Sequence, residues 1–332
     1  MENLKATAAS SPPSPNFKSY TGSFLGEGFE LFFTLLGNAI LTVLTLGIYA
    51  AWGRVKVYQF FYSNTEFAGH RFRFTGTGKE IFIGFLKAIG IIILIYLVFM
   101  LLTTSAMQID PNLFPIIIIG FYLFIIYLFH YAIYSSLRYR FSRSRYREIR
   151  FQLIGKPQEF AWDAFKNFLL AVLTLGIFAP YYMHRKFSYI YNRLHFGNLP
   201  FQYKGDEKEF FKIVFFGFLL TVITFGIYFF WWYPKMYNYY VCHLEAGGGK
   251  FRAEIQPGEF FELLFTNLLI IVFTLGIGFA WVQVRTMKFY IEHLHLEGEL
   301  DLDNVVQVIQ EKVTATGEGL AEALDMDIGL GF

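Results

Sequence analysis

The chain has 332 residues, of which 55% are hydrophobic, 21% are aromatic and only 16% are charged. A soluble domain carries about a quarter charged residues, so this composition excludes an ordinary soluble protein and indicates one that has lipid as its solvent. The formal net charge is only +2, and Cys242 is the single cysteine, which excludes an intrachain disulfide.

The chain begins with a polar segment, residues 1–20, that is rich in serine and proline and contains no apolar run. It does not read as a cleaved signal peptide, and we expect a disordered tail there. A membrane domain is then predicted over residues 21–295. Its six apolar blocks each reach the roughly 20 residues that a helix needs to cross about 30 Å of hydrocarbon. The blocks are 31–52, 81–102, 113–134, 160–182, 210–233 and 260–282.

Four of these blocks are copies of one unit built around the pattern Thr-Leu-Gly-Ile-Tyr. The pattern lies at 45–49, 174–178, 224–228 and 274–278, and its central glycines are Gly47, Gly176, Gly226 and Gly276. A glutamate precedes each threonine by fifteen residues, at Glu30, Glu159, Glu209 and Glu259. An asparagine precedes it by seven, at Asn38, Asn167 and Asn267, with Gly217 in the third copy. A basic residue follows it by eleven, at Lys56, Arg185, Lys235 and Arg285.

The polar linkers between the blocks carry a second pattern. Residues 69–76, 197–205 and 247–252 each read as a turn followed by a short alternating strand. A phenylalanine in these strands precedes the next glutamate by eight residues, at Phe72, Phe151, Phe201 and Phe251. We therefore predict an all-α, polytopic membrane protein with short surface strands in its linkers, which pair at most into a modest sheet.

The repeated unit resembles the YjgN family of bacterial inner-membrane proteins. The features that carry the resemblance are the glutamate, the asparagine, the run Leu-Thr-x-x-Thr-Leu-Gly-Ile-Tyr, the tryptophan, and the basic residues and aromatic linker that follow. The resemblance covers roughly residues 20–295 and implies a multi-pass protein of the bacterial inner membrane. That family is a domain of unknown function, so the resemblance implies no catalytic or binding residue. Gly217 and Gly278 depart from the pattern in the third and fourth copies.

Each unit has two possible paths through the membrane. A straight helix from glutamate to tryptophan measures about 33 Å, which fits one span, and we expect this path. It places the basic linker 184–208 outside, however, against the usual excess of positive charge in cytoplasmic loops. The alternative is a hairpin that bends at each glycine. Asn38 and Lys56 are each nine residues from Gly47, so in a hairpin they would face each other at equal depth.

The recurrent polar residues have a structural and a functional interpretation. We expect the glutamates to stabilise helix N-termini rather than to form an acidic ring or proton relay. We expect the asparagines to make hydrogen bonds between helices rather than to bind a solute or ion. We expect the basic residues to determine topology rather than to bind an anionic ligand. The run Arg138–Arg150 favours an anchor that touches acidic lipid head groups, and nucleic-acid binding is not expected. No pattern indicates an enzyme, a metal site or a cofactor.

Repeated units, interrupted helices and intramembrane asparagines lead us to expect small-solute transport or permeation. The alternative is a non-transporting membrane organiser, or a scaffold that binds lipid or a partner. The chain ends in a tail, residues 296–332, with nine acidic residues against one lysine. This tail reads as soluble, with a short amphipathic helix as one possibility.

Overall fold

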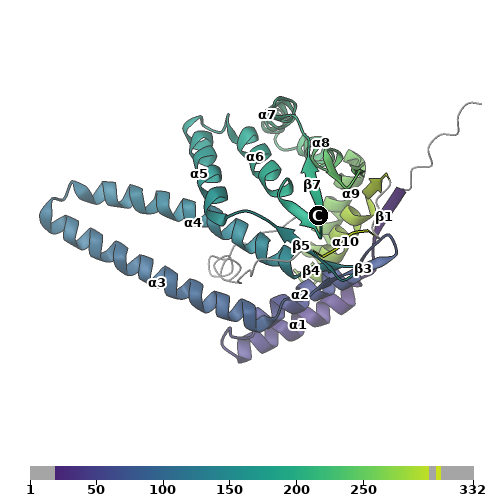
Figure 1. Ribbon diagram of the computed structural model, residues 1–332, viewed down its shortest axis with the longest axis horizontal. Helices are drawn as coiled ribbons and strands as arrows, with labels where there is room; N and C mark the ends of the chain where they lie inside the picture. The colour runs from purple at the N-terminus through teal and green to yellow at the C-terminus, as the bar shows by residue number, and fades with distance from the viewer. Residues whose placement is uncertain (1–18, 299–303, 308–332) are drawn as a thin grey trace, which may run out of the picture.

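The computed structural model describes residues 19–298 and 304–307, in which pairs of helices alternate with pairs of short strands (Figure 1). The helices are α1 (Gly28–Leu44), α2 (Ala50–Asn64), α3 (Gly78–Ile109), α4 (Leu113–Arg143), α5 (Pro157–Leu173), α6 (Ala179–Tyr191), α7 (Glu207–Ile223), α8 (Phe229–Cys242), α9 (Pro257–Phe273) and α10 (Phe279–Glu292). The strands are β1 (Ser19–Phe24), β2 (Thr65–Phe67), β3 (His70–Phe74), β4 (Ser144–Tyr146), β5 (Ile149–Leu153), β6 (Leu194–Phe196), β7 (Leu199–Tyr203), β8 (Leu244–Ala246), β9 (Gly249–Ala253) and β10 (Leu294–Glu297). The predicted tails fall largely outside the described residues, including the possible amphipathic helix; only their inner ends, in β1 and β10, and residues 304–307 are described.

The strands form a closed barrel in which every neighbouring pair is antiparallel, in the order β1-β10-β9-β8-β7-β6-β5-β4-β3-β2. β1 closes it by pairing with β10, where Tyr20 lies opposite Leu296, and with β2, where Phe24 lies opposite Thr65. Short strands were predicted for the linkers, but the expectation of a modest sheet in an all-α protein was wrong. The closure depends on pairing between distant segments, which a local pattern does not reveal.

Alternate residues of the strands form an apolar interior and a charged exterior, as expected for a small closed barrel. The four phenylalanines of the linker pattern lie on the inner face and form a ladder of rings. The centroid distances are 6.2 Å for Phe72–Phe151, 6.5 Å for Phe151–Phe201 and 6.0 Å for Phe201–Phe251. The spacing found in the sequence therefore marks a packing position inside the barrel.

The barrel exterior carries ion pairs between partly exposed side chains. Glu245 accepts a hydrogen bond of 2.5 Å from Lys204, which holds the pKa of that carboxyl below its usual range. On the inner face, burial raises the pKa of Tyr146 to about 12, and its hydroxyl donates to the Phe67 carbonyl at 2.7 Å. The outer and inner faces of the barrel strands, at Glu245 of β8 and Tyr146 of β4, thus meet very different surroundings.

A short C-terminal segment lies against the barrel. Val305 is buried beside Tyr146 and Phe196. Val306 and Asn198 exchange two hydrogen bonds of 3.1 Å each, and the Gln307 side chain accepts from the Arg150 amide at 2.7 Å. This part of the predicted soluble tail is therefore docked on the barrel by both apolar and polar contacts.

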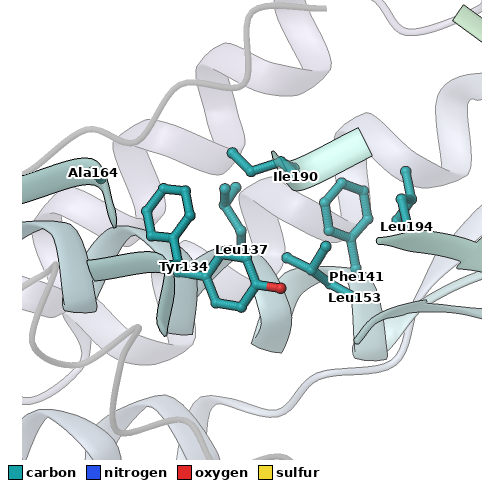
Figure 2. Close-up of a cluster of buried hydrophobic side chains, with 8 residues drawn as sticks. Tyr134, Leu137, Phe141, Leu153, Ala164, Ile190 and Leu194 are labelled. Carbon is teal, nitrogen blue, oxygen red and sulfur yellow. The ribbon is translucent and has the colours of Figure 1, made fainter. Parts of the chain in front are cut away.

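The helices form a closed ring above the barrel, because each helix packs against the next and α10 packs back against α1. In Figure 1 the strands gather at one end of the molecule and the helical hairpins extend away from them, α3 and α4 reaching furthest. The hairpins and the barrel share apolar clusters where they join. One cluster combines Tyr134, Leu137 and Phe141 of α4 with Leu153 of β5 and Ile190 of α6 (Figure 2).

Only α3 and α4, among the described helices, are long and apolar enough to cross a membrane, with mean hydropathies of 2.7 and 2.3. They contain the predicted blocks 81–102 and 113–134 and are confirmed as candidate spans. At 32 and 31 residues they are each about 46–48 Å long, more than a hydrocarbon core of about 30 Å requires. Their rings stack near the far end, with the Phe99 and Phe121 centroids 4.0 Å apart.

The other four apolar blocks are not straight spans, so that prediction was wrong. Each is broken at its Thr-Leu-Gly-Ile segment into two arms, such as α1 and α2 around Gly47. The arms that precede the breaks are 17 residues long, which corresponds to about 25 Å. Because the arms are hairpins, every linker between them returns to the same barrel, including the basic linker 184–208 that straight spans would place on the opposite side.

Candidate functional site

The four breaks, which we call the hairpin tips (45–49, 174–178, 224–228 and 274–278), share one backbone geometry. In each, two consecutive residues have positive φ. The glycines have φ of +92°, +92°, +92° and +88°, in Gly47, Gly176, Gly226 and Gly276. The preceding residues, Leu46, Leu175, Phe225 and Leu275, have φ of +50° to +51°. An L-residue with a side chain is disfavoured there by about 1–2 kcal/mol, so glycine suits the second position and the first is strained.

The tip threonine satisfies the backbone that the break sets free. Thr45 donates its hydroxyl to the Leu41 carbonyl at 2.7 Å and accepts from the Tyr49 amide at 2.9 Å. The amides of residues 45–48 and 50 find carbonyl partners within the same turn. The other three tips repeat these bonds through Thr174, Thr224 and Thr274. No backbone amide in these turns therefore needs water or a neighbouring element.

The strained residue at each tip is large, apolar and almost fully exposed. The exposed fractions are 95% for Leu46, 95% for Leu175, 98% for Phe225 and 92% for Leu275. In water this arrangement is doubly unfavourable, because the backbone is strained and the side chain buries nothing. Hydrocarbon surroundings account for the exposed apolar side chain and for the complete hydrogen bonding of the turn, because lipid demands both an apolar surface and a satisfied backbone. Sequence reasoning marked the glycine as the point of the break and included the threonine in the repeated pattern without giving it a role; it assigned nothing to the exposed residue between them.

The asparagines tie the two arms of a hairpin together. Asn38 donates to the Gly53 carbonyl at 3.0 Å, and Asn267 donates to the Thr286 hydroxyl at 3.0 Å. Asn167 accepts from the Arg185 guanidinium at 3.0 Å. The predicted pairing of asparagine with the facing basic residue is therefore realised in the second hairpin and not in the first or fourth. The interpretation of all three as hydrogen bonds between helices fits these contacts.

The third hairpin replaces this polar contact with an aromatic one. Gly217 stands where the other units have asparagine, and a β-carbon there would lie 2.0 Å from the Trp232 ring. The first hairpin has the reverse arrangement, because Asn38 faces Gly53. In the third hairpin the first arm carries glycine and the second arm carries the larger side chain, whereas in the first hairpin the first arm carries the larger side chain and the second arm carries glycine.

This exchange predicts a compensated pair. Gly217→Asn alone should destabilise the protein by more than about 2 kcal/mol, because the Trp232 ring has to move out of a packed position. Adding Trp232→Gly should restore most of that loss by recreating the arrangement of Asn38 and Gly53. Thermal unfolding in detergent of the two single variants and the double variant measures the coupling, and additive losses would contradict it.

The repeated basic residues reach toward the tips. Lys56 lies over the Tyr49 ring at 5.5 Å, and Arg185 lies over the Phe178 ring at 5.5 Å. The fourth unit has Gly278 at the equivalent position, so no ring is offered to Arg285 there. Among the residues that the structure describes, Lys235 has no comparable contact with a ring. The glutamates lie as predicted in the first turns of their helices, where a carboxylate stabilises the N-terminus.

Arg185 also belongs to an open polar cleft of about 440 Å³ between α5, α6 and the start of α7. Its Nε donates to the Glu207 carboxylate at 2.7 Å while its Nη1 donates to Asn167. Asp163 and Arg193 line the same cleft. The sequence pointed to Asn167 and Arg185, but the other charged residues come from linker and helix positions that no repeat marks.

Removing the Asn167 amide should weaken the second hairpin. Asn167→Ala leaves the Arg185 guanidinium without one acceptor, and we expect a loss of about 0.5–1.5 kcal/mol, the usual range for one hydrogen bond. Asn198→Ala, which alters a surface contact outside the hairpins, is a suitable comparison. Thermal unfolding of both variants is the measurement, and an unchanged Asn167→Ala protein would contradict a structural role for this residue.

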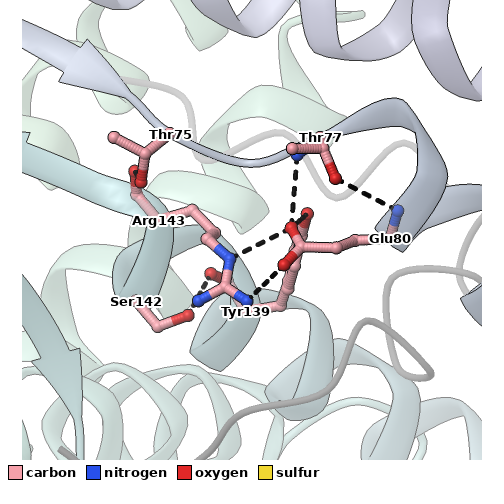
Figure 3. Close-up of polar contacts among 6 residues, drawn as sticks. All are labelled: Thr75, Thr77, Glu80, Tyr139, Ser142 and Arg143. Carbon is pink, nitrogen blue, oxygen red and sulfur yellow. Dashed lines mark hydrogen bonds and ion pairs between the residues drawn. The ribbon is translucent and has the colours of Figure 1, made fainter.

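An ion pair closes the base of the long hairpin, where α3 begins and α4 ends (Figure 3). Glu80 accepts from Arg143 through both carboxylate oxygens, at 2.6 and 3.1 Å, and from the Tyr139 hydroxyl at 3.1 Å. Thr77 and Glu80 form a capping box at the start of α3. Only the capping box was readable from sequence, because Arg143 lies 63 residues away. We call Glu80, Arg143 and Tyr139 the base clamp.

The arginine run 138–150 is partly neutralised by the fold. Arg143 pairs with Glu80, and Arg145 pairs with Glu148 at 3.0 Å. The run continues from the end of α4 into β4 and β5, at the level where helices meet the barrel. This position suits contact with lipid head groups, but the nearby carboxylates reduce the positive charge that the sequence suggests.

The sequence matches one protein family and several named relatives. A family model described as bacterial protein of unknown function (DUF898) matches residues 19–203, 198–235 and 231–323. The chain belongs to this family. Inner membrane protein YjgN of Escherichia coli K12 is 25% identical to this DUF898 chain over 168 residues, which is 51% of this chain and 39% of that protein. YjgN of Salmonella typhimurium LT2 is 36% identical over 80 residues, which is 24% of this chain and 19% of that protein.

The match to the Escherichia coli relative covers about two fifths of that protein's length. No solved structure matches the DUF898 chain. The resemblance to YjgN seen in the repeated motif is confirmed, and so is the location, because the relatives are named inner membrane proteins and two helices suit membrane spans. This DUF898 chain is a bacterial inner-membrane protein.

Proposed function

We propose that this DUF898 chain is a non-enzymatic membrane scaffold that organises lipid by inserting hairpins into the leaflet next to its barrel. The observation that supports this proposal is the structure of the hairpin tips, in which the backbone amides are hydrogen-bonded within the turn and a large apolar side chain is exposed. One Thr-Leu-Gly-Ile unit, used four times, would supply the inserted hairpins, while α3 and α4 cross the bilayer.

The dimensions support insertion without crossing. An arm of about 25 Å reaches past the middle of a hydrocarbon core of about 30 Å but does not traverse it. A tip that crossed fully would place Leu46 or Phe225 in water on the far side. Four hairpins that enter from the barrel side and stop short of the far head groups would displace more lipid from the near leaflet than from the far one, and so would expand the near leaflet. The arginine run supports the same orientation, since its partly neutralised cations lie at the barrel side, where acidic head groups would meet them.

Reconstitution tests this function. Adding the purified full chain to vesicles of about 100 nm at rising protein-to-lipid ratios should reduce vesicle diameter or produce tubules, as seen by cryo-electron microscopy. A variant with aspartate at residues 46, 175, 225 and 275 should leave the vesicles unchanged. Vesicles that keep their shape at every ratio of wild-type protein would refute the proposal.

Small-solute transport is a second candidate, and the polar cleft beside the Asn167–Arg185 pair is the observation that favours it. Against a path along the ring axis, the barrel interior is packed with aromatic rings and with Val305. Vesicles loaded with labelled amino acids or phosphate test this candidate. Protein-dependent efflux that Arg185→Ala abolishes would support transport, whereas efflux equal to that of empty vesicles would exclude it for those solutes.

A further inference from the structure

The polar cleft between α5, α6 and α7 contains charges whose partners are already fixed and charges that remain available. Arg185 and Glu207 neutralise each other at 2.7 Å. Asp206 accepts from the Glu209 amide as a helix cap, and His184 bonds the Gly205 carbonyl at 3.2 Å. These four side chains hold the walls of the cleft in place.

Two charged residues retain capacity for a ligand. Arg193 lies over the Tyr189 ring, with its Cζ 3.6 Å from the ring centroid, and donates one long bond of 3.4 Å to the Tyr189 carbonyl. A guanidinium has five N–H donors, and within the described residues no carboxylate pairs with Arg193. Asp163 accepts from the Asn167 amide at 3.3 Å, and no cation pairs with it in the described part of the chain.

The cleft wall also holds an unused polar atom. The Tyr189 hydroxyl is buried and has no hydrogen-bond partner among the described residues, although Tyr189 itself lines the cleft. Because this hydroxyl is buried, it does not face the opening of the cleft, and Arg193 and Asp163 are the groups that a ligand would meet. The cleft is thus a partly satisfied polar site rather than a closed salt-bridge network.

We propose that this cleft binds a zwitterion, with Arg193 holding its phosphate or carboxylate and Asp163 holding its primary ammonium group. Guanidinium suits planar, bidentate contact with an oxyanion, and a carboxylate suits an ammonium donor. The cleft volume of about 440 Å³ accommodates a phosphoethanolamine head group.

The cleft lies where the hairpin arms meet the barrel. Asp163 is in the second turn of α5, and Arg193 follows the end of α6. If the hairpins insert as proposed above, this level coincides with lipid head groups, so the source we favour is phosphatidylethanolamine. That choice of source rests on the proposed function, whereas the chemistry of the cleft does not.

Lipid retention tests the proposal. The full chain is equilibrated in detergent micelles that contain equal amounts of phosphatidylethanolamine and phosphatidylglycerol, and bound lipid is counted by native mass spectrometry. Wild type should prefer phosphatidylethanolamine about tenfold, since one charge-assisted hydrogen bond corresponds to about that factor. Asp163→Asn, which keeps the side-chain shape, should remove the preference, and Arg193→Gln should lower binding about tenfold. Lys166→Gln, outside the cleft lining, should behave as wild type.

Equal retention of the two lipids by wild type, or equal loss in Lys166→Gln and Asp163→Asn, would overturn the proposal. Free O-phosphoethanolamine distinguishes the source of the ligand. If it raises the melting temperature of wild type while phosphatidylethanolamine is not retained, the lipid source is overturned and the ligand is a soluble zwitterion. Vesicle shape is measured separately, so failure of the scaffold function does not determine this outcome.

Discussion

Replacing Leu175 by aspartate should destabilise the membrane-embedded protein by up to about 2.5–3.5 kcal/mol, the cost of placing a charged side chain at the centre of a hydrocarbon core. Leu175 is 95% exposed at a hairpin tip, so the substitution removes almost no protein contact. The φ of residue 175 is +51°, which aspartate adopts more readily than leucine, so the conformational free energy of the backbone favours the variant. Any loss of stability therefore reports the surroundings of the tip.

The measurement is unfolding of the reconstituted protein in lipid bicelles with increasing denaturant. Leu25→Asp is the matched control, because Leu25 is also an exposed leucine, at 47%, but lies in the linker between β1 and α1. We expect its effect to stay within about 0.5 kcal/mol. Equal stability of Leu175→Asp and wild type would mean that the tip faces water.

Glu80→Ala should cost about 2–3 kcal/mol, because it removes a bidentate, charge-assisted partner from Arg143 and the acceptor of the Tyr139 hydroxyl. It also removes the capping box at the start of α3. The two long helices should then separate at their base before the rest of the ring unfolds. Thermal unfolding in detergent, together with proteolysis after Arg143, follows both events.

Glu148→Ala is the control for this effect. Glu148 also contacts two arginines, Arg73 at 3.6 Å and Arg145 at 3.0 Å, but its side chain is 70% exposed. An exposed pair of this kind contributes about 0–1 kcal/mol. If Glu148→Ala destabilises as much as Glu80→Ala, the loss reflects charge in general and not the base clamp. A double-mutant cycle of Glu80→Ala with Arg143→Ala isolates the pair.

The sequence predicted the parts of this fold that local pattern determines. Membrane character, the two long segments within α3 and α4, the short linker strands and the glutamates in first helical turns all follow from composition, length and capping. The linker phenylalanines were visible as a spacing, although their stacking in the barrel was not. Ring and barrel closure require pairing between β1 and β10, more than 270 residues apart, which a single sequence does not encode visibly.

The choice between straight spans and hairpins depends on a side chain that the sequence pattern contained but whose role sequence reasoning did not recognise. Length fitted a straight span, and glycine alone tolerates either path. The hydroxyl of Thr45 decides for the hairpin, because it satisfies both the carbonyl of Leu41 and the amide of Tyr49 across the break. The charge of linker 184–208 already favoured hairpins. Likewise Asn167 found its basic partner, whereas Asn267 found Thr286, since only the arms' exact rotation determines which side chains meet.

The most direct test of hairpin insertion is thiol labelling in intact cells and in opened membranes. In a Cys242→Ser background, single cysteines are placed at Leu46 in a tip, at Asn112 between α3 and α4, and at Gln202 on the barrel. An impermeant maleimide should label Asn112→Cys from one side only and Gln202→Cys from the opposite side only. Leu46→Cys should resist the reagent from both sides until detergent is added. Labelling of Leu46→Cys from the side that labels Asn112→Cys would show that the tips cross the membrane and would contradict insertion without crossing.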